Sequence, residues 1–450
     1  MTAHARSRLL HLAMAIVALM ALAGIFASAQ TSSYSIINEF SGTDGSSPVG
    51  NLIADSAGNL YGVTQGGGTS TVCPHGCGTV FKLSPTSSSG WQRTVLYEFT
   101  GTADGNQPLA GLAMDSAGKL YGTTYQGGVH ARGVVFELSP TSSGFWKETV
   151  LHAFQGFTAG DGQNPISPMV FDSSGNLYGT TTQGGVGNCG FGAAGCGAVF
   201  ELSPNLQGGW TETVIYSFGT RGGLGDGLSP EGPLVFDSQG ALYGTTFQGG
   251  SLKASCGYPY YGCGIVFKLS LSAGGHWTKT TVHNFRGLSD GGYPTAGVIF
   301  DSAGNLYGAA SAGGLIDTRC INGYGTTGCG VVFSLKLKPA GWEETVLFNF
   351  EYGATGRVPS GTLTFDAAGN LYGAATQGGV VNVNQRGQGV IFELSPSTSG
   401  TWTQTVLHTF NGSDGSGSTS NLILDSEGNI FGTAGGPGPF GNGLVFEIKP

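Results

Sequence analysis

The sequence predicts an all-β fold, a seven-bladed β-propeller with four antiparallel strands in each blade. An eight-residue phrase, Asp-Ser-Ala-Gly-Asn-Leu-Tyr-Gly in its first copy, recurs in seven near-equally spaced copies. The copies start at Asp55, Asp115, Asp172, Asp237, Asp301, Asp366 and Asp425. Such copies indicate one supersecondary unit that stacks on its neighbours. No segment after residue 29 has a 3.6-residue hydrophobic period, so we expect almost no helix.

Each copy divides into four expected strands, A to D. In one copy they lie at residues 109–114, 119–124, 133–138 and 146–154. Asp115 opens the turn between strands A and B, where an aspartate followed by a glycine is typical. Strand C is rich in β-branched and aromatic residues, and Pro140 ends it because proline cannot continue a ladder.

The two ends of the repeat array complement each other. Residues 34–40 align with strand D, whereas residues 443–448 align with strand C, after which the seventh copy stops. We therefore expect the first strand to complete the last blade and close a ring, which removes exposed sheet edges. An open β-solenoid is the alternative, but it needs shorter coils and capping repeats.

Six tryptophans each open an internal strand D, and we expect them to cover the blade flanks. They are Trp91, Trp146, Trp210, Trp277, Trp342 and Trp402.

The first 29 residues have the pattern of a signal peptide. Arg6 and Arg8 precede an apolar run at residues 9–26, and Ala27-Ser-Ala offers a cleavage site. An uncleaved membrane anchor is the alternative interpretation. We expect residues 30–450 to form a single exported propeller domain, secreted, extracellular or periplasmic, without a membrane span and monomeric.

Charge and composition exclude some partners. The net charge is −9, only 10% of residues are charged, and no basic run is present, so nucleic acid and anionic membranes are not expected partners. A content of 83 glycines is typical of a disordered chain, but 39% hydrophobic residues and 26 phenylalanines favour a chain with a packed core.

Eight cysteines fall in four of the loops between strands B and C. The pairs are Cys73/Cys77, Cys189/Cys196, Cys256/Cys263 and Cys320/Cys329, and the other three copies lack both members. In an exported chain this pattern predicts four local disulfides that pin the loops. Zinc binding by the first pair with His75 is the alternative, which an oxidising compartment disfavours.

A meander places the B–C and D–A loops on one face of the ring, where the variable loops favour binding. The loop closed by Cys256 and Cys263 contains Tyr258, Tyr260 and Tyr261. These aromatics would suit contact with a sugar or a protein surface, or they pack against each other or a neighbouring blade.

Other polar positions have structural explanations. Asp44, Asp104, Asp161, Asp226, Asp290 and Asp414 each precede a glycine in the D–A loops, where a ring of aspartates would draw cations but an Asp-Gly turn explains them better. His152, His283 and His408 share one strand D position that Tyr or Phe takes elsewhere, which indicates packing. We find no catalytic, metal-binding or cofactor-binding motif, and expect no cofactor.

The repeat resembles the GloVer tandem-repeat family of exported bacterial proteins. The matching motif runs Asp-Ser-x-Gly-Asn-Leu-Tyr-Gly-x-Thr, then Gly-Gly, then Gly-x-Val-Phe-x-Leu-Ser-Pro, and covers residues 34–450. The resemblance implies a cell-surface or extracellular repeat protein of unknown activity.

These observations favour a non-enzymatic binding scaffold that recognises a polysaccharide or a cell-surface protein. The alternative is a propeller enzyme of lyase or hydrolase type, with its site at the central channel on the face of the B–C and D–A loops. A carboxylate there with a shifted pKa would favour the enzyme.

Overall fold

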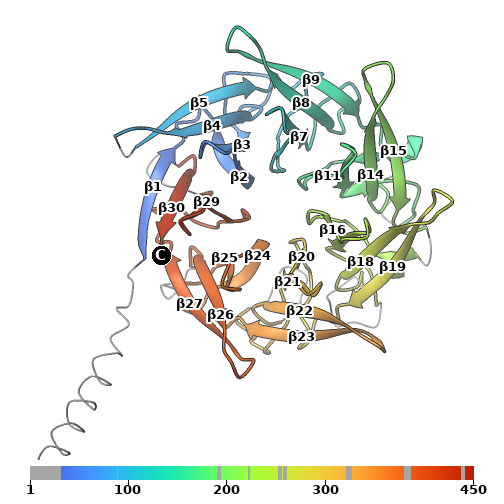
Figure 1. Ribbon diagram of the computed structural model, residues 1–450, viewed down its shortest axis with the longest axis vertical. Coiled ribbons are helices and arrows are strands. Elements are labelled where there is room, and N and C mark those ends of the chain that lie inside the picture. The colour runs from blue at the N-terminus through green and yellow to red at the C-terminus, as the bar shows by residue number, and fades with distance from the viewer. Residues whose placement is uncertain are drawn as a thin grey trace, which may run out of the picture.

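The computed structural model describes residues 32–450 except 89, 190–193, 221–222, 252–255, 257–260, 321–326, 380–386 and 437–440. The expected signal peptide, residues 1–29, therefore lies outside the described residues. Seven four-stranded antiparallel sheets surround a central axis like the blades of a propeller (Figure 1). The predicted fold is confirmed.

In blades 1 to 6 the strands run from the centre outwards in chain order, while the first strand of the chain is the outermost strand of blade 7. Blade 1 contains β2 (Ser46–Ala54), β3 (Leu60–Gly66), β4 (Thr79–Pro85) and β5 (Trp91–Glu98). Blade 2 contains β6 (Ala113–Met114), β7 (Leu120–Thr124), β8 (Val134–Pro140) and β9 (Trp146–Ala153). Blade 3 contains β11 (Val170–Phe171), β12 (Leu177–Thr181), β14 (Ala198–Pro204) and β15 (Trp210–Ser217). Blade 4 contains β16 (Val235–Phe236), β17 (Leu242–Thr246), β18 (Ile265–Leu271) and β19 (Trp277–Asn284).

The remaining blades repeat this order. Blade 5 contains β20 (Ile299–Phe300), β21 (Leu306–Ala310), β22 (Val331–Lys338) and β23 (Gly341–Asn349). Blade 6 contains β24 (Arg357–Phe365), β25 (Leu371–Gln377), β26 (Val390–Pro396) and β27 (Trp402–Thr409). Blade 7 contains β28 (Ile423–Leu424), β29 (Ile430–Ala434), β30 (Leu444–Lys449) and β1 (Ser33–Glu39). A two-stranded ribbon, β10 (Gly162–Gln163) with β13 (Gln183–Gly184), and two 3₁₀ turns, η1 (Phe157–Ala159) and η2 (Gly223–Asp226), complete the described chain.

The ring closes as the sequence predicts. Strand β1 pairs antiparallel with β30, and Tyr34 lies opposite Ile448 while Ile36 lies opposite Phe446. The blue first strand and the red last strand lie side by side in Figure 1. This pairing supplies the outer strand that the seventh copy lacks.

Two strand boundaries differ from the prediction. Residues 109–112 were expected in strand A, but β6 contains only Ala113 and Met114. Gly111, just before this strand, instead contacts the channel segment of the preceding blade, where the side-chain amide of Asn51 lies against it. Strand β8 extends to Pro140 because the last residue of a strand need not donate a ladder hydrogen bond.

The glycine that ends each Leu-Tyr-Gly phrase is required by a phenylalanine. A Cβ atom on Gly122 would lie 2.5 Å from Cζ of Phe136, which projects from the adjacent strand C. Phe136 is fully buried and packs edge-to-face against Phe99 of the preceding blade, with ring centroids 5.2 Å apart. Equivalent phenylalanine pairs link all seven blades: 40/81, 99/136, 154/200, 218/267, 285/333, 350/392 and 410/446.

The tyrosine and the tryptophan of the repeat meet across blade boundaries. The ring centroids of Trp210 and Tyr121 of the preceding blade lie 5.9 Å apart, and the Tyr121 hydroxyl donates to Oδ2 of Asp115 at 3.2 Å. Four other tryptophans stack in the same way on an aromatic ring of the preceding blade: Trp91, Trp277, Trp342 and Trp402. Trp146 packs against the equivalent cluster between blades 1 and 2.

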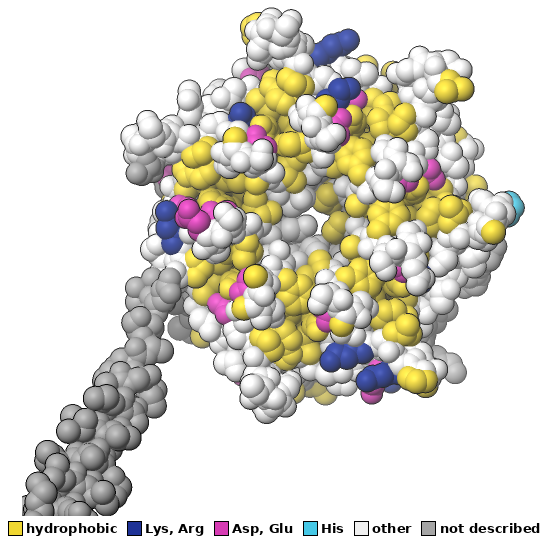
Figure 2. All heavy atoms as spheres, viewed as in Figure 1, with side chains coloured by type: hydrophobic (Ala, Val, Ile, Leu, Met, Phe, Trp, Pro, Cys, Tyr) yellow, Lys and Arg dark blue, Asp and Glu magenta, His cyan; other side chains and the backbone are white. Residues whose placement is uncertain are grey.

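Hydrophobic side chains gather in patches between the blades on the face shown in Figure 2. No helix in the described part of the chain has the length and apolarity needed to cross a bilayer.

Candidate functional site

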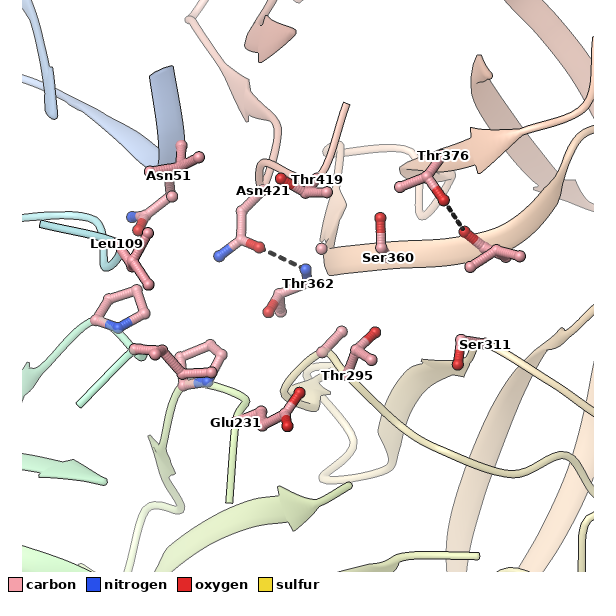
Figure 3. Close-up of a pocket in the computed structure, with 18 residues that line it drawn as sticks. Asn51, Leu109, Glu231, Thr295, Ser311, Ser360, Thr362, Thr376, Thr419 and Asn421 are labelled. Carbon is pink, nitrogen blue, oxygen red and sulfur yellow. Dashed lines mark hydrogen bonds between the residues drawn. The ribbon is translucent and has the colours of Figure 1, made fainter. Parts of the chain in front are cut away.

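A cavity of about 460 Å³ opens at the central axis (Figure 3). Its wall includes one residue at the same repeat position of every blade: Val49, Leu109, Ile166, Glu231, Thr295, Ser360 and Thr419. Its volume lies in the usual range for small-ligand sites.

The D–A loop of each blade positions these seven channel-lining residues. Just before Pro294, Tyr293 adopts a left-handed conformation with φ 56°, and its N–H donates to the Cys263 carbonyl at 2.8 Å. Val358 repeats this arrangement with the Cys329 carbonyl at 2.9 Å. The turn occurs in every blade, at Ser47, Gln107, Asn164, Ser229, Tyr293, Val358 and Gly417. It ties each channel segment to the B–C loop of the preceding blade and directs the second residue after it towards the axis.

At these seven equivalent positions the channel wall is apolar on one side and polar on the other, while Asn51 of blade 1 and Pro233, Ala296 and Val358 of blades 4 to 6 also line it. Blades 1 to 3 contribute Val49, Leu109 and Ile166, whereas blades 4 to 7 contribute a carboxyl and three hydroxyl groups. Figure 3 shows Leu109 across the opening from Thr295 and Ser360. Such a surface can cover the apolar side of a ligand while its polar side makes hydrogen bonds.

Among the described residues that line the cavity, Glu231 is the single titratable one. Burial raises the pKa of Glu231 to about 7, which the hydrogen bond donated by Ser229 Oγ at 3.3 Å partly offsets. The carboxyl group is therefore partly protonated near neutral pH and can donate or accept a hydrogen bond.

A second ring of polar groups lies next to the first. Asn421 Oδ1 accepts from the Thr362 backbone N–H at 2.5 Å, and Thr362 Oγ1 accepts from the Gly297 N–H at 3.2 Å. Asn51 Oδ1 is buried and has no hydrogen-bond partner in the described part of the chain. These contacts join neighbouring blades around the axis and leave an acceptor at the cavity.

The four expected disulfides are present: Cys73–Cys77, Cys189–Cys196, Cys256–Cys263 and Cys320–Cys329. The second cysteine of each pair accepts the backbone hydrogen bond from the left-handed channel residue of the next blade. The disulfides thus hold the loops that also position the channel wall.

The tyrosine-rich loop is described only in part. Tyr258 and Tyr260 lie outside the described residues. Tyr261 is half-buried and packs against the hydrophobic cluster between blades 3 and 4, and its carbonyl accepts from Gly249 N–H at 2.6 Å. At Tyr261 the packing interpretation therefore has direct support.

The six aspartates of the D–A loops cap their own turns. Asp104 Oδ2 accepts from the Thr100 N–H at 2.7 Å, and Asp414 Oδ1 accepts from the Asn411 N–H at 2.9 Å. The D–A loops also bond to the B–C loops, as in the 2.8 Å contact from Gly128 N–H to Thr102 carbonyl. The two loop sets share a face, as predicted.

The three strand D histidines pack on a phenylalanine and also approach these aspartates. His152 lies edge-on to Phe154 with ring centroids 4.9 Å apart, and its Nε2 lies 3.0 Å from Oδ2 of Asp161. His408 and His283 approach Asp414 and Asp290 at 3.1 and 3.7 Å. Packing was predicted, but the aspartate contact was not.

Three glutamates on the outer strands face the same aspartates. Burial, and secondly the charge of Asp104, Asp161 or Asp290, raises the pKa of Glu148, Glu212 and Glu344 to about 7. These carboxyl pairs were not predicted, because the paired residues are more than 40 positions apart in the chain.

Glu231 was also missed. A signal was present, because aligning the residues that follow the channel proline gives Val, Leu, Ile, Glu, Thr and Ser, with Thr in the seventh copy. The charged residue breaks an otherwise uncharged series.

Solved structures share the fold at low identity. A puromycin-hydrolysing peptidase of Mycobacterium tuberculosis matches with a TM-score of 0.50 and 11% identity over 93% of this chain, which spans only 55% of that chain. A Trichoderma reesei carbohydrate-active enzyme of family AA12 and the pyranose dehydrogenase PQQ domain of Coprinopsis cinerea each match at TM-score 0.44 and 12% identity, over 94% of this chain and 96% of theirs. The first of these likenesses shows the fold alone. A search of the curated proteins found no match.

The model of one protein family matches the chain three times. It is described as the Gloeobacter/Verrucomicrobia repeat, and the matches cover residues 23–255, 149–320 and 256–450. Together they include the whole propeller, so this chain belongs to the Gloeobacter/Verrucomicrobia repeat family.

Proposed function

We propose that this protein is an exported, non-enzymatic binding module that takes a carbohydrate, such as a polysaccharide end, at its central channel. The observation that carries the proposal is the two-sided wall of the cavity. A sugar ring has an apolar face and a hydroxyl edge, so its face would pack on Val49, Leu109 and Ile166. Its hydroxyl groups would bond to the polar side.

Two further features support export and binding. Four disulfides suit an oxidising compartment outside the cytosol, and we retain residues 1–29 as a proposed signal peptide and residues 30–450 as one proposed domain. The preformed wall also suits binding, because little order must be imposed when a ligand enters.

Contact at the rim remains a second proposed mode. In this mode a cell-surface protein would contact the loop that carries Tyr258, Tyr260 and Tyr261. We rank the channel first because Tyr261 contributes to packing between blades.

An enzyme of lyase or hydrolase type draws support only from the raised pKa of Glu231, which suits a general acid. Glycoside hydrolysis commonly uses two carboxyl groups, and within the described part of the chain the cavity lining includes no second titratable side chain.

The test is a glycan array with the purified mature protein, followed by calorimetric titration of any ligand found. Ser360→Phe should fill part of the cavity and abolish binding, while the triple variant Tyr258→Ser, Tyr260→Ser and Tyr261→Ser should still bind. Leu206→Ser, at a fully exposed position, is the matched control. Unchanged affinity in a folded Ser360→Phe protein, with loss in the triple variant, would move the site to the rim. Turnover of the glycan would favour the enzyme.

A further inference from the structure

The junctions between blades share one arrangement of positions, at which the charge of the residue differs. The outer-strand residue two positions after the tryptophan faces the aspartate of the preceding D–A loop. Between blades 3 and 4 this residue is Lys279, whose Nζ lies 2.9 Å from Oδ1 of Asp226. Between blades 7 and 1 it is Arg93, whose guanidinium pairs with Asp44. In both junctions the chain itself places a cation on the aspartate, which is buried at Asp226 and partly buried at Asp44.

The junction between blades 2 and 3 has no such cation at this position. Its outer strand β15 places Glu212 there instead, facing Asp161. On the other side, His152 on β9 lies with Nε2 3.0 Å from Oδ2 of Asp161. One nitrogen and two carboxylate oxygens of these residues all lie within 4.8 Å of one another.

The carboxyl groups of Asp161 and Glu212 lack the lysine or arginine that pairs with the aspartate at two other junctions. The Asp161 side chain is 8% exposed, and Oε1 of Glu212 is buried with no hydrogen-bond partner among the described residues. Two carboxylates side by side in a poorly hydrated place are unfavourable unless a positive charge lies between them. Lys279 and Arg93 supply this positive charge at the equivalent position of two other junctions.

We propose that His152, Asp161 and Glu212 bind a divalent transition-metal cation, with Zn²⁺ the best match to the donor set. An imidazole nitrogen with two carboxylate oxygens suits zinc, which takes such ligands at about 2.0–2.2 Å. Two ligand atoms at that distance from one ion lie about 3 Å apart, as His152 Nε2 and Asp161 Oδ2 do.

The bound ion would join strand β9, the D–A loop and strand β15. It would therefore cross-link blades 2 and 3 at their outer edge, away from the channel. Its role would be to hold the junction, as the Lys279–Asp226 pair does one junction further round the ring.

Two other junctions carry a glutamate but fit zinc less well. Between blades 1 and 2, Tyr97 replaces the histidine, so no nitrogen ligand is present. Between blades 4 and 5, His283 lies 3.7 Å from Asp290, and Arg286 adds a positive charge beside Glu344. Among the described residues the one other group of metal-ligand types contains Cys320 and Cys329, whose sulfurs form a disulfide.

The test uses the full exported protein after treatment with a chelator. Titration with ZnCl₂ alone should show about one tight site per chain and raise the melting temperature, while CaCl₂ should do neither. Two variants introduce the residues of the junction between blades 3 and 4. Glu212→Lys introduces a lysine at the position equivalent to Lys279, and His152→Tyr introduces a tyrosine at the position equivalent to Tyr216.

Both variants should lose the tight zinc site and the zinc-dependent rise in melting temperature. Glu212→Lys should keep the metal-free melting temperature or raise it, because the lysine can pair with Asp161 as Lys279 pairs with Asp226. If one variant does not fold, the other decides. Absence of tight zinc binding in the wild type, or wild-type zinc binding in either folded variant, would overturn the proposal.

Discussion

The Lys279 ammonium group and the Asp226 carboxylate form a buried ion pair that joins two blades. Nζ lies 2.9 Å from Oδ1 of Asp226 and 2.7 Å from its backbone carbonyl, and the side chains are 6% and 5% exposed. Both carboxylate oxygens also lie 2.8 Å from the Tyr216 hydroxyl on the preceding blade. The pair thus fixes the D–A loop between the two outer strands.

Removing one partner of this pair should be costly. We expect Lys279→Met to lower the free energy of unfolding by about 3–5 kcal/mol, because the Asp226 carboxylate would stay buried without its cation. Chemical denaturation measures the change. Lys119→Met is the control, since Lys119 is 40% exposed beside Glu137 and its loss should cost about 1 kcal/mol or less. Equal effects in the two variants would contradict this interpretation.

The glycine of the repeat phrase should not tolerate a methyl group. Gly122→Ala is expected to destabilise the protein by about 2–3 kcal/mol, because the new Cβ overlaps the tip of the Phe136 ring. In a protein that already carries Phe136→Leu, Gly122→Ala should cost less stability than it does in the wild type, because the ring tip that the new Cβ would overlap is gone. Gly274→Ala is the control for the backbone effect, because Gly274 is exposed, does not have a positive φ, and a Cβ there would meet no atom closer than 3.7 Å. Strict additivity of the two changes would argue against the clash.

The tryptophans should stabilise the ring without contributing to binding at the channel. Trp210→Ala would expose Tyr121 and Phe171, which pack edge-to-face beside it. We expect a loss of about 2–3 kcal/mol by thermal denaturation, below the value for a fully buried tryptophan. Phe145→Ala, at a side chain 75% exposed, should change stability by about 0.5 kcal/mol or less. A Trp210→Ala protein of normal stability that lost a ligand would refute the structural role.

Stability should fall with rising pH because of Glu148. Burial, then the charge of Asp104, raises the pKa of Glu148 to about 7, so the folded protein holds this proton more tightly than the unfolded chain does. Its contribution is therefore complete below the unfolded pKa of about 4.3 and is lost as the pH rises through about 7. Glu148→Gln should leave stability nearly unchanged at low pH and raise it at pH 8 by about 1–2 kcal/mol, a value reduced for solvent screening.

A natural amide supports the choice of glutamine at position 148. Gln404 occupies the equivalent position in blade 6, and its Nε2 donates to the Thr355 carbonyl at 2.9 Å. Denaturation curves of both proteins at low and high pH measure the effect, with the exposed Glu427→Gln as control. A pH-independent difference between Glu148→Gln and the wild type would exclude the titration of Glu148 as its cause.

Binding at the channel should depend on the protonation of Glu231. Its raised pKa of about 7 means that the carboxyl O–H is available as a donor below that pH and is lost above it. A carbohydrate that accepts from Glu231 should therefore bind more weakly as the pH rises through about 7. Glu231→Gln keeps a donor at every pH and should remove this dependence, which calorimetric titration at several pH values can measure. A pH profile unchanged by the substitution would place the titrating group elsewhere.

Much of the fold could be predicted because contacts between residues close in sequence determine the turns and strands of each repeat. Asp55 begins its turn by accepting from the Ala57 and Asn59 N–H groups, and Gly58 takes the left-handed conformation there. These contacts span only a few residues, so the residue types and their spacing indicate them. The closing strand was likewise predictable, because Tyr34 and its neighbours match a strand that the last copy lacks.

The sequence alone therefore determined seven blades, their strand order, the closure of the ring and the four cysteine pairs. Only the tertiary structure decided which side chains meet around that ring. Glu231 reaches the axis because a left-handed turn at Ser229 directs it there, and Glu212 faces Asp161 across 51 residues of chain. The physical reason is that local hydrogen bonds shape a blade, whereas the channel and the junctions form only when all seven blades pack together.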